Sequence, residues 1–289
     1  MDLFSLPASD GLGISCAYFP AVTPKASIQI IPGAKDHKER YYDFAKFLNQ
    51  AGFAVILADN RGHGASVNAA YPLGYMDNLP LMVEDLYHVS EWAKAKAPDA
   101  PLDLFGHSFG SLLARLYLQK HDTAIEKLAM SGTVRPSNAA VLGVALAQKT
   151  VSKKGKRNQK TLLARLGNGG NLNWVNSDKA KVEEFRNDPL SGGYTYANVS
   201  VLTLVESVEE IAQISNYHCQ NPSLLIFSAT GEFDPFTGGK VGLNETKRIL
   251  GKEGYAHFKS IIYPHFKHEL VTSTGNEAIL QDLLAFYRQ

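Results

Sequence analysis

The segment around Ser108 most constrains the fold, because it joins a strand pattern to a helix pattern through a turn that few residue types permit. The apolar run 102–105 (LDLF) precedes the pentapeptide GHSFG at 106–110, and a helical pattern follows over 109–120. Glycines two positions before and after the serine remove side chains that would clash in a sharp turn. The pattern predicts a strand–turn–helix unit that exposes the serine hydroxyl at its apex.

Strand and helix patterns alternate on both sides of this unit. Buried strands are expected over 26–31, 53–58, 125–130, 223–228 and 258–263. Helices are expected over 39–50, 78–97, 240–250 and 277–287. Such alternation is typical of a parallel sheet with right-handed crossovers. The predicted fold class is therefore α/β, with a mostly parallel central sheet flanked by helices.

Residues 135–200 interrupt the alternation. The region is rich in Asn, Gly and Lys and contains no buried-strand pattern. We interpret it as a mainly helical cap (a lid) inserted between the two core segments, 1–134 and 201–289. No Pro/Ser-rich linker sets it apart, so cap and core are expected to form one domain.

A serine hydroxyl is a weak nucleophile and needs a general base, which a third group orients. Where the serine stands on such a turn, the chain order is Ser, then Asp or Glu, then His, in loops at the carboxyl ends of later strands. Asp234 follows the first strand expected after residue 222, and His268 follows the next one. Glu232 and His265 lie close by, and position after the strand does not separate the two pairs; we favour Asp234 and His268.

The oxyanion of an acyl-transfer reaction needs backbone N–H donors. One donor is expected from Phe109, which follows the serine, and the other from the loop PGAKDH after the strand 26–31. Pro32 has no N–H group, so the second donor is expected to be Ala34, with Gly33 as the alternative.

Two further histidines lie near these motifs. His63 stands between glycines in RGHGAS, and His107 directly precedes Ser108. We interpret His63 as structural, because the expected triad already contains a base. By alternation with Ser108, His107 is expected to point away from the site and to pack in the core.

Taken together, these motifs resemble the monoacylglycerol lipase and lysophospholipase branch of the α/β hydrolases, the serine aminopeptidase S33-type hydrolases. The stretch GAKDHKERYYDFAKFLNQAGFAVILADNRGHGAS is similar to the branch's segment HGxxEHxxRYxxxAxxLxxxGxxVxxxDxRGHGxS. GHSFGSLLARLY, GEFDPFTGGKVG and YPHFKHEL are similar to its nucleophile, acid and histidine loops, and NDPL at 187–190 to a phrase of its cap. The resemblance implies the α/β-hydrolase fold, and it favours His268, because the family's base directly precedes a Glu, as His268 precedes Glu269.

The chain departs from the branch at three positions. Pro32 stands in place of the usual His, Asp36 in place of Glu, and Phe109 in place of the common Met. The oxyanion donors are backbone groups, so Phe109 is still expected to serve, whereas Pro32 leaves the shape of the loop open.

The resemblance implies a serine carboxylic-ester hydrolase that works through an acyl-enzyme. Its expected substrate is a small acyl ester, a single-chain lipid such as a monoacylglycerol or a lysophospholipid. A general short-chain carboxylesterase or thioesterase is one alternative. A non-catalytic ligand-binding protein on the hydrolase scaffold is another.

Two stretches of the expected cap bear on the substrate. The apolar stretch 139–147 (AAVLGVALA) is expected to line an acyl-chain tunnel, to pack the cap onto the core, or to do both. The stretch 149–160 (KTVSKKGKRNQK) carries six basic residues and no acidic one. It predicts either a solvated, mobile turn or attraction to anionic lipid surfaces.

Composition limits the other function classes. The net charge of +1 gives no overall field that would attract nucleic acid. The sequence contains no metal-ligand cluster and no GxGxxG-type loop, so we expect neither a metal nor a cofactor. Apolar stretches fall far short of the roughly 20 residues that span a bilayer. With no leader pattern at the N-terminus, a cytoplasmic protein is expected, with transient membrane-surface contact allowed and the oligomeric state open.

Overall fold

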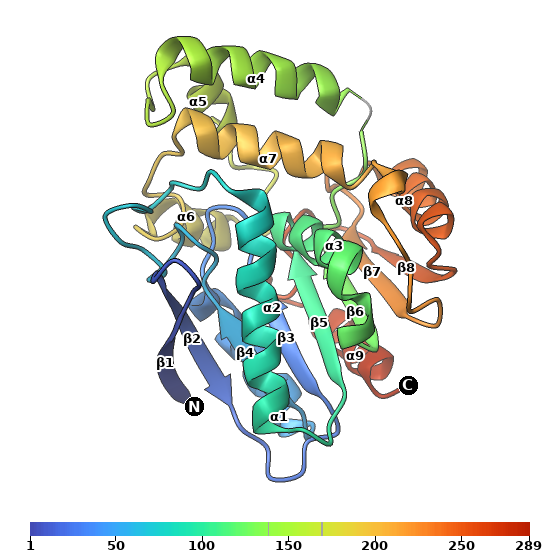
Figure 1. The fold of residues 1–289 in the computed structure, drawn as a ribbon. Coiled ribbons are helices and arrows are strands. Elements are labelled where there is room, and N and C mark those ends of the chain that lie inside the picture. Colours follow the sequence, from blue (N-terminus) through green and yellow to red (C-terminus); the bar gives the residue numbers. More distant parts are fainter. Residues whose placement is uncertain (138, 169) are drawn as a thin grey trace.

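An eight-stranded sheet in the order β1-β2-β4-β3-β5-β6-β7-β8 forms the centre of the computed structural model, which describes residues 1–137, 139–168 and 170–289 (Figure 1). The strands are β1 (Asp2–Pro7), β2 (Gly13–Phe19), β3 (Ser27–Ile31), β4 (Ala54–Ala58), β5 (Leu102–His107), β6 (Lys127–Ser131), β7 (Leu225–Gly231) and β8 (His257–Tyr263). β1 pairs antiparallel with β2, and β2 with β4, whereas the other pairings are parallel. The predicted α/β class is confirmed.

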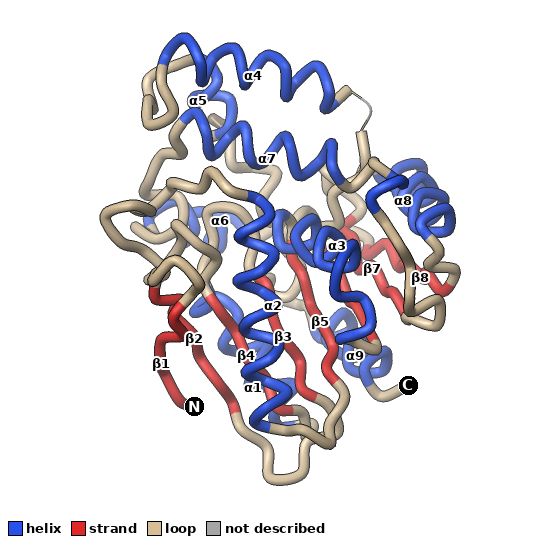
Figure 2. Tube along the Cα trace, in the orientation of Figure 1, coloured by secondary structure: helices blue, strands red, loops and turns tan. Residues whose placement is uncertain are grey.

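Helices cover both faces of this sheet (Figure 2). Apolar side chains of α2 (Leu79–Lys96), α3 (Phe109–His121) and α8 (Gly239–Glu253) pack in one core cluster. Those of α1 (Tyr42–Gln50) and α9 (Glu277–Tyr287) pack in a second cluster on the opposite face. Short 3-10 turns lie at Lys38–Tyr41, Asp122–Ala124 and Ile214–Asn216. In the part of the chain described, no helix has both the length and the apolarity that crossing a membrane requires.

Burial on both faces explains which strands could be predicted. Every residue of β3, β4, β5 and β6 is buried, as expected for parallel strands between two helical layers. The hairpin of β1 and β2 was not anticipated, because β1 lies at the sheet edge, is mostly exposed and ends at a proline. The hairpin extends the parallel sheet at the β4 edge.

Among the described residues between β6 and β7, four α-helices occur: α4 (Ala140–Lys154), α5 (Leu162–Gly167), α6 (Lys179–Asn187) and α7 (Asn198–Glu210). Figure 1 shows α4, α5 and α7 beyond the carboxyl end of β5, with α4 outermost. α7 packs against α3, and α4 against α7. The expected boundary at residue 200 falls inside α7, whose buried residues Val201, Leu202 and Thr203 continue the helix past it.

The apolar stretch of α4 divides between two faces of the helix. Val144 and Ala147 are buried and form a cluster with Leu202 of α7. Leu142 and Leu146 point the other way and are 75% and 71% exposed. The stretch therefore packs α4 onto α7 through one face only.

Candidate active site

Ser108 occupies a sharp turn between β5 and α3. Its φ of 53° and ψ of −117° lie in a region that non-glycine residues seldom adopt, at a cost of about 1–3 kcal/mol. A Cβ on Gly110 would lie 2.1 Å from the carbonyl oxygen of Ile31, and one on Gly106 would lie 2.4 Å from that of Gly110. The flanking glycines therefore let β3 and α3 approach closely enough to hold the serine in this conformation.

The structure brings Ser108, His268 and Asp234 together. Oγ of Ser108 lies 2.7 Å from Nε2 of His268. On the other side of the ring, Nδ1 lies 3.0 Å from Oδ1 of Asp234, which is an ion-pair distance without linear hydrogen-bond geometry. His268 and Asp234 are buried, whereas Ser108 is partly exposed. The three side chains therefore form a continuous polar row with its accessible end at the serine.

Asp234 is fixed by its own loop. The N–H group of Phe236 donates to Oδ1 at 2.9 Å, and the hydroxyl of Thr237 donates to Oδ2 at 2.9 Å. Burial alone would raise the pKa of Asp234, but the charge of His268 and these hydrogen bonds hold that pKa below its ordinary value. The carboxylate is thus charged where it faces His268.

The two neighbouring candidates lie outside this row. Glu232 and His265 are exposed, and the N–H group of His265 donates to Oε2 of Glu232 at 3.1 Å. Both belong to the loops that hold Asp234 and His268, but the structure joins them to each other instead of to Ser108.

Two backbone segments border the serine hydroxyl. Phe109 is the first residue of α3, where N–H groups have no partner within the helix and the helix dipole favours negative charge. The loop after β3 passes close to the serine, because a Cβ on Gly33 would lie 3.2 Å from Cβ of Ser108.

Tyr196 forms a hydrogen bond to the loop after β3. Its hydroxyl accepts a hydrogen bond of 2.7 Å from the N–H group of Lys35, a residue with a left-handed φ of 53°. Burial lowers the pKa of Lys35 to about 8. Among the described hydrogen bonds, none involves the N–H groups of Gly33 or Ala34, so the geometry leaves both as candidate donors.

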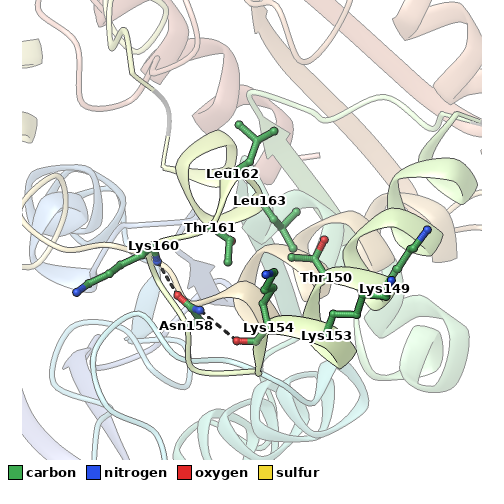
Figure 3. A pocket seen from close by; sticks show the side chains of 9 residues that line it. All are labelled: Lys149, Thr150, Lys153, Lys154, Asn158, Lys160, Thr161, Leu162 and Leu163. Atoms are coloured by element: carbon green, nitrogen blue, oxygen red, sulfur yellow. Dashed lines mark hydrogen bonds between the residues drawn. The ribbon is translucent and has the colours of Figure 1, made fainter.

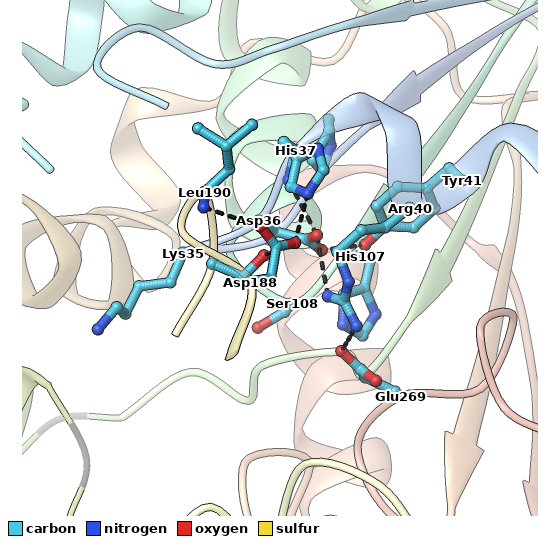
Figure 4. A network of polar contacts seen from close by, with 12 residues as sticks. Lys35, Asp36, His37, Arg40, Tyr41, His107, Ser108, Asp188, Leu190 and Glu269 are labelled. Atoms are coloured by element: carbon cyan, nitrogen blue, oxygen red, sulfur yellow. Dashed lines mark hydrogen bonds and ion pairs between the residues drawn. The ribbon is translucent and has the colours of Figure 1, made fainter. Parts of the chain in front are cut away.

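Asp36 lies at the centre of a buried network (Figure 4). Its carboxylate accepts hydrogen bonds from Arg40 at 3.0 Å, from the hydroxyl of Tyr41 at 2.5 Å and from the N–H group of His37 at 2.9 Å. Burial would raise the pKa of Asp36, but the charge of Arg40 and these hydrogen bonds outweigh it and lower that pKa. Arg40 also donates to Glu269 at 2.6 Å. A partly buried cation thus joins the loop after β3 to the loop that carries His268.

The segment between α5 and α7 meets the same two loops. Nε2 of His37 lies 2.7 Å from Oδ2 of Asp188, which belongs to the NDPL motif. The side chain of Asn176 donates to Glu269 at 3.2 Å, and the N–H group of His268 donates to the carbonyl of Trp174 at 3.3 Å. The motif was visible in the sequence, but nothing in its pattern identified these partners.

His107 packs, as expected, but it does not point away from the site. Its ring centroid lies 5.0 Å from that of His268, and its Nδ1 lies 2.9 Å from Oγ of Ser131. Alternation failed here because Ser108 belongs to the turn and no longer follows the strand. Burial lowers the pKa of His107 to about 3, so its ring stays neutral beside His268.

His63 is fully buried, where the core meets the segment that precedes α7. Its Nδ1 lies 3.0 Å from the carbonyl oxygen of Arg61, and its Nε2 lies 2.6 Å from the hydroxyl of Tyr196. Burial lowers its pKa. His63 therefore supports Tyr196, which in turn holds Lys35.

Two aromatic residues that the sequence analysis did not single out surround the histidine. The ring centroids of Trp174 and Phe236 lie 5.2 Å and 5.0 Å from that of His268, and 4.8 Å from each other. Phe236 is 41% exposed. Within the described ranges, no group of three His, Cys, Asp or Glu side chains is arranged to hold a metal ion.

The family model described as serine aminopeptidase, S33 matches residues 22–274. The chain therefore belongs to this family of α/β hydrolases, as its sequence motifs predicted.

Curated relatives match part of the chain. It is 30% identical to the monoglyceride lipase of Rattus norvegicus over 151 residues, which are 51% of this chain and 49% of the relative. It is 26% identical to the probable lysophospholipase L2 of Haemophilus influenzae over 122 residues, which are 41% of this chain and 39% of the relative. The matched region thus spans about half, or less, of the length of these relatives.

Solved structures match the whole chain. A thermostable carboxyl esterase from Bacillus coagulans, in complex with glycerol, superposes with a TM-score of 0.87 at 23% identity, covering 99% of this chain and 97% of the other. A monoglyceride lipase from Saccharomyces cerevisiae superposes with a TM-score of 0.77 at 17% identity, covering 99% and 94%. These likenesses show the α/β-hydrolase fold.

Proposed function

We propose that the protein is a serine hydrolase of carboxylic esters, with Ser108 as nucleophile, His268 as general base and Asp234 as the group that orients the histidine. The observation that carries this proposal is the 2.7 Å separation between Oγ of Ser108 and Nε2 of His268 on a strained turn. A nucleophile within hydrogen-bond reach of a base, itself oriented by a buried carboxylate, is the arrangement that activates serine.

In the first step, His268 takes the hydroxyl proton as Oγ of Ser108 bonds to the ester carbonyl carbon. The carbonyl oxygen becomes an oxyanion, which the N–H groups of Phe109 and Ala34 stabilise, with Gly33 as the alternative to Ala34. The C–O bond to the alcohol then breaks, and His268 gives its proton to the leaving alkoxide. Asp234 stabilises the imidazolium between these transfers.

In the second step, water attacks the acyl-Ser108 ester while His268 takes one of its protons. The tetrahedral intermediate collapses, the acid leaves, and His268 returns the proton to Oγ of Ser108. The neutral ring of His107 behind His268 adds no like charge to oppose the imidazolium.

The substrate class we propose is a lipid ester with one acyl chain, such as a monoacylglycerol or a lysophospholipid. The names of the rat and Haemophilus relatives favour this class. We further propose that residues 135–200, together with the rest of α7, act as a cap that selects the substrate. The support is that Tyr196, Asp188 and Asn176 contact the loops beside Ser108 and His268.

A chain-length series of p-nitrophenyl esters, from acetate to palmitate, tests the proposal through kcat/KM. We expect medium or long chains to be preferred, and Ser108→Ala to abolish turnover. A preference for acetate or butyrate would instead favour a short-chain esterase. Thioesters of the same chains, assayed in parallel, distinguish a thioesterase.

The non-catalytic alternative has a separate test. A fluorophosphonate probe should label the wild-type protein and leave Ser108→Ala unlabelled. Labelling without turnover of any ester in the series would favour a binding protein. Absence of labelling would contradict the assignment of Ser108 itself.

A further inference from the structure

The hydroxyl of Tyr196 joins the cap to the loop after β3 through a hydrogen-bond chain whose direction is fixed. The carbonyl oxygen of Arg61 carries no proton, so Nδ1 of His63, 3.0 Å away, donates to it. A neutral imidazole then has an acceptor at Nε2, and the Tyr196 hydroxyl, 2.6 Å away, donates to that atom. The oxygen of the same hydroxyl accepts the N–H group of Lys35 at 2.7 Å. Each group in the chain therefore has one role.

The chain keeps this direction because the ring of His63 stays neutral. His63 is fully buried, and burial lowers its pKa. A protonated ring would donate from both nitrogens and leave the proton of the Tyr196 hydroxyl without this acceptor. Burial thus keeps the ring in the form that orients the hydroxyl of Tyr196.

The loop after β3 is held on both sides of its candidate oxyanion donors, Gly33 and Ala34. On one side, the side chain of Asn60 donates to the carbonyl oxygen of Pro32 at 2.9 Å. On the other side lies Lys35, whose left-handed φ of 53° non-glycine residues seldom adopt. A residue in such a conformation persists only where its surroundings hold it. The bond from Lys35 to Tyr196 therefore helps to hold the segment that carries the candidate donors.

Tyr196 is itself fixed within the cap. It is fully buried, and its N–H group donates to Oδ1 of Asn168 at 2.8 Å. Two residues further on, the N–H group of Asn198 donates to the carbonyl oxygen of Asn158 at 3.0 Å, and its side chain accepts from the hydroxyl of Thr161. Asn158 and Thr161 belong to the turn between α4 and α5, where they line a groove of about 490 Å³ (Figure 3). The hydroxyl of Tyr196 thus ties the loop after β3 to an ordered part of the cap.

We propose that Tyr196 is a positioning residue for ester hydrolysis, because its hydroxyl fixes the loop after β3 in the shape that directs a backbone N–H group at the oxyanion. The described hydrogen bonds of the hydroxyl go to His63 and Lys35, so it acts through the loop. Donors that are already in place stabilise the charge that develops in the transition state. The inference rests on the proposed function, since it assigns a support to the oxyanion site of that reaction.

Tyr196→Phe tests the proposal, because it removes the hydroxyl and keeps the ring. We expect kcat for the preferred p-nitrophenyl ester to fall about 10- to 100-fold with little change in KM, because an oxyanion donor is no longer held. Tyr287→Phe is the matched control, since that buried hydroxyl donates to the carbonyl of Leu104 at 2.9 Å, on the sheet face covered by α1 and α9. The control should keep wild-type kcat. Equal losses of kcat in the two variants would contradict the proposal, and urea unfolding compares their stabilities.

Two ketone inhibitors separate support of the oxyanion from a purely structural role. The hydroxyl of Ser108 adds to an octyl trifluoromethyl ketone: Oγ bonds to the carbonyl carbon, the proton passes to His268, and the carbonyl oxygen becomes an oxyanion. The matching methyl ketone binds with its carbonyl group intact. Tyr196→Phe should weaken the trifluoromethyl ketone about 10- to 100-fold and the methyl ketone less than ~2-fold. Equal weakening of both ketones, or of neither, would overturn the proposal.

Variants of His63 test the direction of the chain. His63→Gln offers a carbonyl oxygen in place of Nε2 and should keep kcat within about 3-fold of wild type, whereas His63→Leu removes the acceptor and should lower kcat at least ~5-fold. The double variant of Tyr196→Phe and His63→Leu should be no slower than Tyr196→Phe alone, because effects within one hydrogen-bond chain do not add. Losses that multiply in the double variant would show that the two residues act separately.

A fluorophosphonate probe keeps this inference distinct from the proposed function. Attack of Ser108 on the probe places negative charge on the phosphoryl oxygen, and the labelling rate requires no ester turnover. Tyr196→Phe should be labelled at least ~5-fold more slowly than wild type, and Tyr287→Phe at the wild-type rate. A wild-type protein that hydrolyses no ester would contradict the proposed function, whereas equal labelling of Tyr196→Phe and wild type would overturn the role of Tyr196.

Discussion

The guanidinium of Arg40 lies 2.6 Å from the carboxylate of Glu269, and it lies 3.0 Å from that of Asp36. Asp36 is two residues from Ala34, and Glu269 directly follows His268. One partly buried cation therefore sets the distance between the candidate oxyanion loop and the candidate base. Arg40 is in this sense a positioning residue, since its described hydrogen bonds go to Asp36 and Glu269 and none goes to Ser108 or His268.

Arg40→Lys should lower kcat by about 10- to 100-fold with little change in KM, because a lysine cannot hold both carboxylates in one planar fork. Steady-state kinetics on a p-nitrophenyl ester measure kcat and KM separately. Thermal unfolding shows whether the variant is folded. Arg248→Lys is the control, because that pair with Glu245 is half exposed at 3.8 Å. A variant of Arg40 with wild-type kcat would contradict the positioning role.

Asp234→Asn should reduce kcat by about 10⁴-fold while the fold persists, because the amide no longer stabilises the imidazolium. Glu232→Gln, two residues away in the same loop, is the informative comparison, since that side chain is exposed. We expect it to keep wild-type kcat. If instead Glu232→Gln is the inactive variant, the acid has been assigned to the wrong residue.

Gly110→Ala should destabilise the protein by at least ~2 kcal/mol, because its Cβ would lie 2.1 Å from the carbonyl oxygen of Ile31 and backbone would have to move. Gly251→Ala in α8 is the matched substitution, with nothing within 4 Å of the new Cβ. It should be neutral or stabilising by about 0.5–1 kcal/mol. Urea unfolding of both variants measures the contrast; equal losses would contradict it.

Asp103→Asn should stabilise the protein above pH 7. Burial raises the pKa of Asp103 to about 7 despite Lys127 at 3.7 Å, and neither carboxylate oxygen has a hydrogen-bond partner among the described residues. The folded state thus binds a proton at a pH where the unfolded chain does not, so stability from this group falls as the pH rises from about 4 to about 7.

Urea unfolding at pH 5 and pH 8 measures this effect. The gain from Asp103→Asn should be about 1–3 kcal/mol at pH 8 and smaller at pH 5. Asp99→Asn, at an exposed position, should change neither value. A gain that is equal at the two pH values would show that the charge of Asp103 is not its cause.

The sequence predicted those strands and turns whose local residue pattern agrees with their burial in the folded protein. The continuous apolar run of β4 and the glycine-flanked turn at Ser108 each specify their own conformation. β1 escaped prediction, since an edge strand needs no apolar run. α7 spans an expected boundary, because it packs against both α3 and α4 and no local pattern encodes those contacts.

The candidate site likewise has residues that the sequence indicated and contacts that only the structure shows. Strand positions indicated the loops that carry Asp234 and His268, but they did not separate these residues from Glu232 and His265, over which the family resemblance favoured them. The structure brings Ser108, Asp234 and His268 together, whereas their catalytic roles stay predictions. The contacts of Arg40 with Glu269 and of His37 with Asp188 join residues 229 and 151 positions apart. No local pattern encodes such pairs, because they depend on how the loops meet in space.

The edge position of β8 has a consequence for the order of folding. β8 pairs with β7 alone, and the loop that follows it carries His268. As the ribosome delivers the chain, the turn with Ser108 can form against β3 well before the last strand exists, while contacts of such long sequence separation form late. A partly made chain thus holds a serine without its base, so ester turnover reports that the last strand has docked.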